Sequence, residues 1–460
     1  MTLSPREVVE APAREWRRYP EYKDSGVEWL GEIPVQWCSK PVKSIARFVS
    51  RGSSPDYAEY SSIPVINQAC VRWDGLHLEN VKYQRDEDVS GWKGLLHPGD
   101  LIMNSTGTGT LGRAAIFDAD GTYLADSHIT IVRVASENHR TSYLRYLIST
   151  PLYQGYVYST LVSGSTNQIE LSREGLRSMP LISPPLQEQQ AISAFLDKET
   201  QKIDGLIAKR ERLIGLLEEK RTALISKAVT KSLDPNVPMK DSGVEWLGEI
   251  PAHWAVPPLY SRYSVQLGKM LDQKSFRGEG MAPYLRNTNV TWDHVNTDDL
   301  LEMEFSLEDK RKFSLKPGDL LVCEGGEVGR TAIWRGELEE CYFQKAIHRL
   351  RPLRDSEEPR FLYYVMYAAV RFGVFLAGGN KSTIVHLTAE KLRKHRFPFP
   401  AYQEQKDIVD YLDRETAKID RLLGKVQDHI QKLREYRTAL IAAAVTGKID
   451  VRDELGRAGT

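Results

Sequence analysis

Few residues in this sequence are spaced as a catalytic site requires. Glu308-Asp-Lys310, with Asp298 or Asp299 before it, comes nearest to the acidic motif of a metal-dependent nuclease. Such a tripeptide is common in charged helices, and the similar first half of the chain has no counterpart. The Pro-Pro pairs at Pro184 and Pro257 lack the flanking residues of the Asn/Asp-Pro-Pro-aromatic motif of adenine methyltransferases. We therefore predict that the chain carries no catalytic site of its own.

Motifs for nucleotides and metals are also missing from the sequence. It contains neither a GxxxxGK[ST] phosphate loop nor an HExxH pair. The cysteines stand far apart, without a CxxC or a Cys/His cluster, at Cys38, Cys70, Cys323 and Cys341. We expect no ATP-driven motor and no structural zinc, and the scattered cysteines favour a reducing cytoplasm as the location.

Hydrogen-bonding side chains in loops offer chemistry of a different kind, because Arg, Asn, Gln, Ser and Thr can contact base edges and phosphates. In the first half of the chain these candidates are Asn67, Gln68, Arg72 and Trp73 after a predicted strand, Asn104, Ser105, Thr106 and Arg113 around a glycine-rich loop, and Ser165, Thr166, Asn167 and Gln168 in a polar run. In the second half they are Arg286, Asn287, Thr288, Asn289 and Trp292, then Glu324, Gly325, Gly326 and Arg330, and finally Lys381, Ser382 and Thr383 after Asn380.

Two of these candidates, Arg113 and Arg330, occupy matching places in the two halves. A side chain that reads sequence should differ between copies, so we assign this pair to phosphate contact or to structure. Glycine loops let a backbone approach a phosphate closely, but glycine also simply makes turns. The polar loops that differ between the halves are the better candidates for specificity.

An internal repeat organises the chain that must position these residues. KDSGVEWLGEIP occurs at residues 23–34 and again, identically, at 240–251. At a nearly constant offset, HPGDLI at residue 97 parallels KPGDLL at 316, and RTALI at 221 recurs at 437. The chain is therefore two copies of one unit of roughly 215 residues, joined near residues 233–238.

Each copy begins with a mixed globular part, about residues 38–180 and 255–396, which we call the first and the second head. Short apolar runs broken by Gly, Pro, Asn and Asp predict strands, for example at 63–66, 129–134 and 347–350. Tyrosine-rich stretches at 143–158 and 361–375 are predicted as helices.

Each copy ends in a long helix without internal proline, about residues 186–229 and 402–445. Apolar residues seven apart predict a coiled-coil seam: Leu412, Ile419, Val426, Leu433 and Leu440, with Leu422, His429 and Tyr436 interleaved, and in copy one Leu196, Ile203, Leu217 and Leu224, with Leu206 and Leu213 interleaved. Arg210, Lys220 and His429 interrupt this seam. At 1.5 Å per residue each helix would span roughly 65 Å. A packed bundle helix shows a similar pattern and is the alternative.

The two helices can pair with each other inside one chain. Short connections through the heads favour an antiparallel coiled coil and approximate two-fold symmetry, with a head at each end. In the repeated segment, Val27, Trp29, Leu30 and Ile33 are expected to anchor the head to the helices. Glu188, Asp197 and Glu199 are interpreted as a solvated helix face.

Composition limits the alternatives. The 460 residues contain 41% hydrophobic and 27% charged residues, typical of a soluble globular protein with more than one core. The longest apolar run, residues 361–370, is half of the ~20 residues that a bilayer span needs. The N-terminus lacks the apolar stretch of a secretion signal. Net charge is zero, which argues against a protein that binds DNA tightly by itself but permits one that binds with basic partners.

The repeat motifs resemble those of type I restriction-modification specificity subunits. KDSGVEWLGEIP followed by Trp37 or Trp254 resembles the segment that opens each target-recognition domain in that family. The GDL…GR…AI pattern at 100–116 and 319–333, and the QEQ…LD.ET..ID…RTALI…AVT helix, are also similar to it. The resemblance covers residues 22 to 453.

This resemblance implies a division of the chain into an N-terminal extension (1–21), target-recognition domain 1 (22–185), a central spacer helix (186–232), target-recognition domain 2 (233–400), a C-terminal spacer helix (401–453) and a tail (454–460). Each domain would read one half of a split site in double-stranded DNA. Two methyltransferase subunits would dock on the helices, and restriction subunits would complete the enzyme. S-adenosylmethionine, ATP and magnesium would bind to those partners, and none of them to this chain.

Two other interpretations remain open from the sequence. A scaffold that does not bind DNA could use coiled-coil arms to hold two protein-binding heads apart. An enzyme with two tandem active sites would need motifs that the sequence lacks. Divergent heads on similar helices favour DNA recognition over a symmetric scaffold.

Overall fold

The structure is a computed structural model that describes residues 16–135, 137, 139–164, 169–270, 278, 280–376 and 386–454. It divides into two compact units. Unit 1 combines residues up to Arg210 with residues from Asp428 onward, and unit 2 is Glu211–Gln427. Each unit therefore holds one head together with half of each long helix.

Unit 1 contains two four-stranded sheets, in the orders β4-β11-β8-β9 and β10-β6-β7-β5. Their strands are β4 (Ala46–Arg51), β5 (Tyr57–Ala58), β6 (Ile63–Ile66), β7 (Lys82–Gln84), β8 (Asp100–Asn104), β9 (Ala114–Phe117), β10 (Leu124–Ala125) and β11 (Ile129–Val134). Short antiparallel pairs join β1 (Tyr22–Asp24) to β2 (Glu32–Pro34), β3 (Cys38–Pro41) to β14 (Pro180–Ser183), and β12 (Val162–Ser163) to β13 (Glu170–Leu171). The helices of the first head are α1 (Val42–Ile45), η1 (Leu78–Asn80), α2 (Thr141–Ile148), α3 (Pro151–Tyr156), the π-helical turn η2 (Val157–Leu161) and α4 (Arg173–Ser178).

Unit 2 repeats this topology. Its main sheet has the order β17-β25-β22-β23, and a second sheet has the order β21-β18-β24. Strands β18 and β24 are parallel, as are β6 and β10 in unit 1. The strands are β15 (Met239–Asp241), β16 (Glu249–Pro251), β17 (Tyr263–Leu267), β18 (Met281–Leu285), β19 (Val290–Thr291), β20 (His294–Val295), β21 (Leu301–Glu304), β22 (Leu320–Cys323), β23 (Thr331–Ile333), β24 (Tyr342–Phe343) and β25 (Ile347–Pro352). The helices are η3 (Leu259–Ser261), η5 (Asn287–Asn289), α6 (Leu307–Phe313), α7 (Pro359–Arg371) and α8 (Ala389–Lys394).

The strands predicted at 63–66, 129–134 and 347–350 are confirmed as β6, β11 and part of β25. The helix predicted at 143–158 is interrupted after α2. Pro151 lacks an N–H and occupies the first turn of α3, where the side chain of Thr150 accepts a hydrogen bond from the N–H of Tyr153. In the second head the matching helix α7 runs without a break to Arg371.

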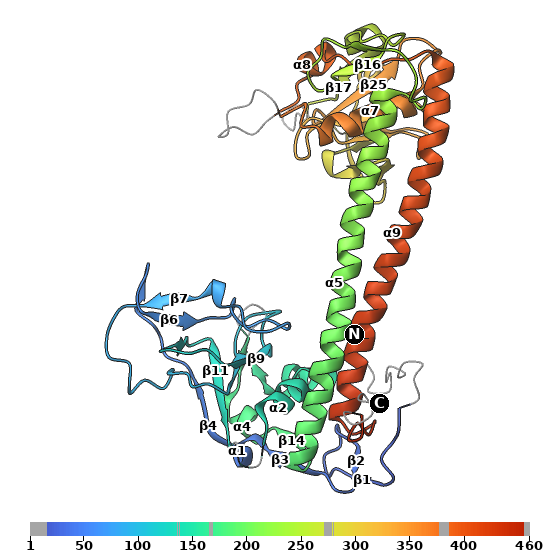
Figure 1. The fold of residues 1–460 in the computed structure, drawn as a ribbon. Coiled ribbons are helices and arrows are strands. Elements are labelled where there is room, and N and C mark those ends of the chain that lie inside the picture. Colours follow the sequence, from blue (N-terminus) through green and yellow to red (C-terminus); the bar gives the residue numbers. More distant parts are fainter. Residues whose placement is uncertain are drawn as a thin grey trace. The chain divides into compact units, whose positions relative to one another are not determined.

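The long helices α5 (Leu186–Lys231) and α9 (Tyr402–Val445) lie side by side within each unit (Figure 1). The N-terminal half of α5 packs with the C-terminal half of α9 in unit 1, and the other two halves belong to unit 2, so the pairing is antiparallel. Asp204 of α5 pairs with Arg437 of α9, at 2.9 Å between Oδ1 and Nε. The repeat places Arg221 opposite Asp420 in the same way. The predicted antiparallel coiled coil is confirmed.

Most interleaved positions of the predicted seam are wrong by one residue, whereas Tyr436 packs against the core of unit 1 as predicted. Leu206 is 44% exposed and Leu422 49% exposed, and His429 faces solvent. The residues buried between the heptad positions are instead one place later, such as Ile430. Leucine on both sides of the seam made the two registers similar in sequence, and only packing distinguishes them.

The repeated segment anchors each head as predicted. Leu30 and Ile33 are buried in a core that also contains Ile192 and Leu196 of α5 and Leu440 of α9. Trp29 stacks on Tyr156, with ring centroids 4.3 Å apart and an interplanar angle of 14°. Leu247, Ile250 and Trp254 take the same part in unit 2. The two copies are thus attached to the helices in the same way.

Candidate nucleic-acid interface

The first two groups of predicted contact residues meet at one place in unit 1. The side-chain amide of Gln68 donates to the main-chain oxygen of Thr106 at 2.7 Å. Asn104 Nδ2 donates to the main-chain oxygens of Gln68 and Val71, each at 3.3 Å. The turn after β6 is therefore held against the glycine-rich loop after β8, although 36 residues separate Gln68 from Asn104.

The third group, Ser165–Gln168, lies outside the described residues, but the segment that follows it reaches the same place. The N–H of Gly107 donates to the main-chain oxygen of Ile169 at 3.4 Å, and that of Leu171 donates to Ser105 at 2.8 Å. The first two groups and the residues that follow the third group thus meet around the glycine-rich loop.

Burial separates the residues of this cluster into two kinds. Asn67, Asn104 and Ser105 are buried, and their side chains hold the loops together; Ser105 Oγ, for example, bonds to Thr130 Oγ1. Trp73, by contrast, is 47% exposed, and Arg72 beside it is also exposed. Gln68 and Thr106 are half-buried at the edge between the two kinds.

The second head assembles the matching cluster from its own residues. Asn287 Nδ2 donates to the main-chain oxygen of Gly325 at 3.0 Å, and the Arg330 guanidinium donates to the main-chain oxygen of Asn287 at 3.0 Å. The N–H of Leu387 donates to the main-chain oxygen of Glu324 at 3.0 Å. Leu387 follows the group Lys381, Ser382 and Thr383, which lies outside the described residues.

Arg286 and Asn289 are fixed by a common acidic partner. Arg286 forms an ion pair with Asp299, at 2.7 Å between NH2 and Oδ2, and Asn289 Nδ2 donates to Asp299 Oδ1 at 2.7 Å. Asn289 is buried, whereas Thr288 between them is exposed. Thr288 is therefore the member of this segment that presents its side chain to solvent.

The matching pair Arg113 and Arg330 is held by different partners in the two heads. Arg113 donates to the main-chain oxygen of Gly109 at 2.8 Å. Arg330 bonds instead to Asn287 and to the Cys323 sulfur, 3.7 Å away. Burial raises the pKa of the Cys323 thiol to about 11, so it remains protonated beside this guanidinium at neutral pH.

The glycine that precedes each of these arginines is required by the fold. Gly112 and Gly329 have φ values of 85° and 87°, in the left-handed region. A Cβ at Gly112 would lie 2.3 Å from Gln154 Oε1, and one at Gly329 would lie 2.6 Å from a ring carbon of Phe375. At these two positions the close approach of another segment of the same chain is enough to explain the glycine.

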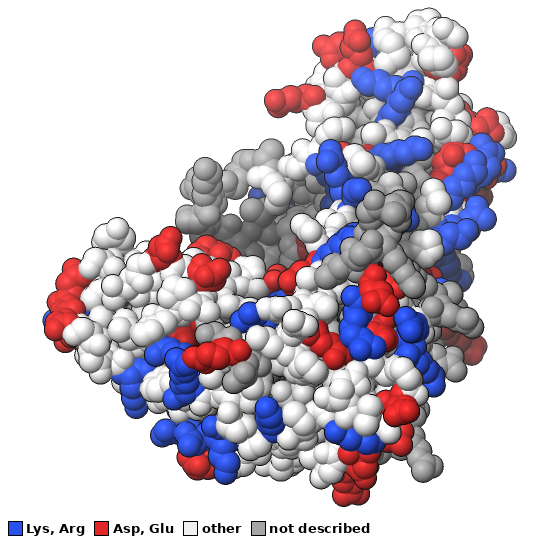
Figure 2. Space-filling view, turned by 60° about the horizontal axis from the view of Figure 1, so that its bottom comes forward, with Lys and Arg blue, Asp and Glu red and all other residues white. Residues whose placement is uncertain are grey.

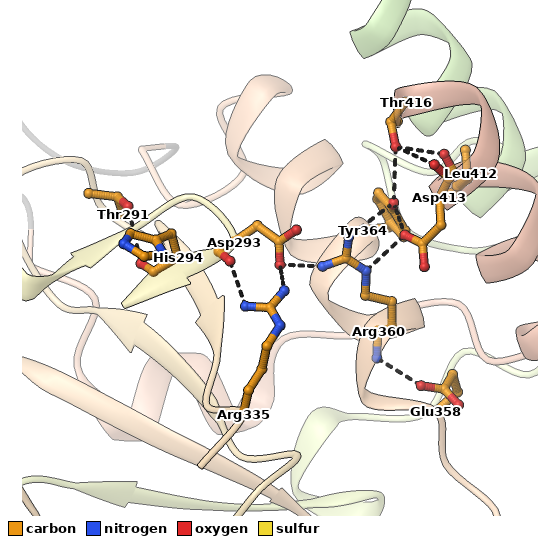
Figure 3. A network of polar contacts seen from close by, with 10 residues as sticks. All are labelled: Thr291, Asp293, His294, Arg335, Glu358, Arg360, Tyr364, Leu412, Asp413 and Thr416. Atoms are coloured by element: carbon orange, nitrogen blue, oxygen red, sulfur yellow. Dashed lines mark hydrogen bonds and ion pairs between the residues drawn. The ribbon is translucent and has the colours of Figure 1, made fainter. Parts of the chain in front are cut away.

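A tyrosine-aspartate-threonine contact joins each head to its long helix. Tyr146 of α2 donates to Asp197 Oδ1 at 2.6 Å and lies 3.4 Å from Thr200 Oγ1. Tyr364 of α7 makes the same contacts with Asp413 and Thr416 (Figure 3). Asp197 thus binds the head as well as facing solvent.

The interpretation of Glu188 as part of a solvated face is wrong. Glu188 is only 6% exposed, and its carboxylate accepts a hydrogen bond from the Tyr19 hydroxyl at 2.5 Å. Burial, followed by the bond to Glu188, raises the pKa of Tyr19. In the second copy the matching Glu404 accepts from the Trp254 indole N–H at 3.0 Å. A glutamate on a charged helix gives no sign in sequence that a distant segment covers it.

The second head has one further polar network, which the sequence did not predict. Arg360 of α7 forms ion pairs with Asp293, in the turn after β19, and with Asp413 of α9 (Figure 3). Arg335 also binds Asp293, at 2.6 Å between NH2 and Oδ1. The Trp-Asp pair that occurs in both copies, at residue 73 and at residue 292, was the available signal for this turn.

Within the described ranges, no group of three or more His, Cys, Asp or Glu could hold a metal ion. Among the helices described, none is long and apolar enough to cross a membrane. Figure 2 shows Lys and Arg mixed with Asp and Glu over the face that it presents, in keeping with a net charge of zero.

Comparison with known proteins agrees with this duplicated recognition fold. The family model for the type I restriction modification DNA specificity domain matches residues 34–214 and 263–432, which together make up more than half of the chain. The chain therefore belongs to the family of type I restriction-modification specificity subunits. Two matched regions agree with the two heads, as expected from the repeat.

Individual relatives are distant but match over almost their full length. A type I restriction enzyme specificity subunit (MjaX) of Methanocaldococcus jannaschii is 21% identical over 433 residues, 92% of this chain and 96% of the relative. The EcoKI specificity subunit of Escherichia coli K12 is 19% identical, over 91% of this chain and 90% of the relative.

Solved structures share the fold. A chain from a type I R-M system superposes with a TM-score of 0.68 at 16% identity, over 90% of this chain and 98% of that one. The HsdS subunit of Thermoanaerobacter tengcongensis gives a TM-score of 0.50 at 16% identity, over 91% of this chain and 98% of that subunit.

Proposed function

We propose that this chain recognises a bipartite sequence in double-stranded DNA, with each head reading one half. The paired helices set the separation of the two half-sites and carry two methyltransferase subunits, and restriction subunits join the assembly. The chain performs no chemistry itself. S-adenosylmethionine, ATP and magnesium bind to the partner subunits and not to this chain. The observation that carries this proposal is a pair of heads with one topology whose loops differ in sequence around the same glycine-centred cluster.

Within each cluster we assign DNA contact to the accessible side chains. In the first head these are Arg72, Thr106 and Gln68, together with Trp73. In the second head Thr288 and the half-buried Arg286 are the corresponding residues. The buried residues Asn67, Asn104, Ser105 and Asn289 position the loops, and Arg113 and Arg330 fix the glycine-rich turn or contact phosphate. The polar segments at 165–168 and 381–383 are proposed as further DNA contacts.

Methylated adenines in the host genome provide the first test. Single-molecule sequencing should reveal a motif of two short blocks separated by a constant gap. Half-sites read from one face of the duplex should have centres about one helical turn apart, roughly 34–36 Å. A random or continuous methylation pattern would contradict the proposal.

A head exchange tests the assignment of each half. Replacing residues 38–180 with the head of a related subunit should change one block of the motif and leave the other unchanged. Exchange of residues 255–396 is the matched control and should change only the other block. A change in both blocks after one exchange would show that the heads do not read independently. Binding that ignores sequence altogether would favour the scaffold interpretation.

A further inference from the structure

The turn between β19 and β20 continues directly from the predicted contact segment of the second head. Residues 286–289 lead into β19, and Trp292 and Asp293 form the turn. Asn289 Nδ2 donates to the main-chain oxygen of Asn296 at 3.1 Å, so both ends of this hairpin are joined. Movement of the turn would therefore move the contact segment with it.

Two sets of contacts hold the turn in place. Asp293 has a φ of 61°, a left-handed conformation that is uncommon outside glycine. Its main-chain oxygen and its carboxylate both accept hydrogen bonds from Arg335, at 2.8 and 2.6 Å. Trp292 packs edge-on against Tyr367, with ring centroids 5.0 Å apart, and its indole N–H donates to Glu327 at 2.9 Å.

Arg360 links the turn to the long helix α9. One guanidinium nitrogen binds Asp293, and Nε lies 2.9 Å from Asp413 Oδ1 on α9. The guanidinium also lies over the ring of Tyr363, 4.7 Å from its centroid. Burial by itself would lower the pKa of Arg360, but the bond to Asp293 and the nearby carboxylates outweigh it and raise the pKa, so the bridge stays charged.

The first head has a turn at the matching place, without the bridge and without a positive φ at its aspartate. Its Trp-Asp pair is Trp73-Asp74, but Ser142 stands at the position of Arg360 and Asp118 at that of Arg335. The Asp74 side chain is 74% exposed, and among the described residues its ion-pair partner is the nearby His77, at 3.2 Å. The contact to the helix through Tyr146 and Asp197 remains. In the part of the chain that the structure describes, ion pairs therefore bridge the turn to the helix in the second head and not in the first.

We propose that Arg360 is a positioning residue that fixes the recognition loop of the second head to helix α9, and so sets how strictly the complex requires one half-site spacing. The inference rests on the proposed function. A loop held through two ion pairs to the helix that sets the spacing cannot follow a displaced half-site. A loop without the bridge can shift, and the first head has that freedom.

The test uses the complex of the full chain with its methyltransferase subunits. The probes are duplexes carrying the motif that the wild-type complex methylates, with the native gap or with one base pair more or less. Arg360→Met removes both ion pairs and keeps an apolar stem of similar length. Asp293→Asn removes the charge at the turn and suits the left-handed backbone, because Asn adopts it readily. Asp74→Asn is the matched control in the first head.

Both variants of the second head should lower the preference for the native gap over the altered gaps by about tenfold, the scale of a typical coupling between sites. Asp74→Asn should leave that preference unchanged. An equal loss of affinity for all three duplexes would mean a purely structural role and would overturn the inference. An unchanged ratio in both variants, or the same change in the control, would also overturn it. If the wild-type complex recognised no gapped motif, the proposed function would fail together with this inference.

Discussion

The two heads share their attachment to the helices and differ in how their loops are held. Tyr146 and Tyr364 make the same contacts to an aspartate and a threonine of α5 and α9, respectively. Trp73 is exposed, whereas Trp292 packs against two tyrosines. Duplication has therefore preserved the joints between head and helix and allowed the surroundings of the loops to diverge. Two domains that recognise different DNA sequences need this combination of a conserved attachment and divergent loops.

The largest contrast between the heads should appear at the paired tryptophans. Trp292→Ala removes aromatic packing and a hydrogen bond to Glu327, and should lower the stability of unit 2 by about 2–3 kcal/mol. Trp73→Ala should cost under about 1 kcal/mol, because its side chain is already partly in solvent. Hydrogen exchange measured separately for each unit would show both effects.

In DNA binding, the loss should be larger for Trp73→Ala than for Trp292→Ala. Because we propose that the exposed Trp73 ring contacts DNA, Trp73→Ala should weaken binding by roughly tenfold while unit 1 stays folded. If Trp73→Ala and Trp292→Ala lowered stability equally, the turn of the first head would be packed as firmly as that of the second, and the contrast between the heads would be wrong.

A smaller difference is expected where each repeated segment meets its helix. Trp254 donates to Glu404, whereas Trp37 Nε1 has no hydrogen-bond partner among the described residues. Both indoles are fully buried. Trp254→Phe should therefore destabilise by about 1 kcal/mol more than Trp37→Phe. Thermal unfolding of both variants provides the measurement, and an equal cost would mean that the bond to Glu404 adds nothing net.

Low pH should destabilise unit 2 through the buried His348, whose place in the first head is taken by Thr130. Burial lowers the pKa of His348 below its usual 6.5, although its bond to the Leu387 carbonyl opposes this. The unfolded chain then binds a proton more readily than the folded one. The contribution of His348 to stability is complete above pH 6.5 and is lost as the pH falls below it.

His348→Gln should reduce this pH dependence in unit 2 without changing that of unit 1. Denaturant unfolding at pH 7 and pH 5, followed by exchange in each unit, would measure it. His139→Gln is the comparison for unit 1, because burial also lowers the pKa of His139. An unaltered pH dependence of stability in His348→Gln would show that the His348 imidazole does not contribute to it.

The smallest effects are expected at the ion pairs that repeat along the coiled coil. Asp204→Asn and Asp420→Asn each break one exposed pair and should cost about 0.5 kcal/mol. The two values should agree, because the pairs occupy equivalent places in the repeat. High salt should diminish both. A large difference between them would indicate that the two halves of the coiled coil are not equivalent.

Sequence predicted the parts of the fold that depend on periodicity and repetition. The duplication, the strands at 63–66 and 129–134, and the long helices each follow from local patterns of apolar residues. The seam was displaced at its interleaved positions because leucines such as Leu206 and Leu422 lie just outside it. Their distinction depends on packing between segments that are far apart in the chain.

The sequence indicated which loops could form a candidate site, and it was less informative about the roles of individual residues. The loops around residues 67 and 104 were expected separately, and the structure brings them together. A polar residue in a loop looks the same in sequence whether it closes the loop, as Asn104 does, or faces solvent, as Thr288 does. Arg360 was missed because its two partners, Asp293 and Asp413, are 67 and 53 residues away in the chain.

The interleaving of the chain in unit 1 bears on its synthesis. Val445, Ile449 and Val451 fill the same core as Trp37 and Tyr143. The ribosome makes these residues long after it has made the first head, so the core of that head stays incomplete until they follow. A stop codon between the first head and this segment would therefore damage a domain whose own coding region is intact.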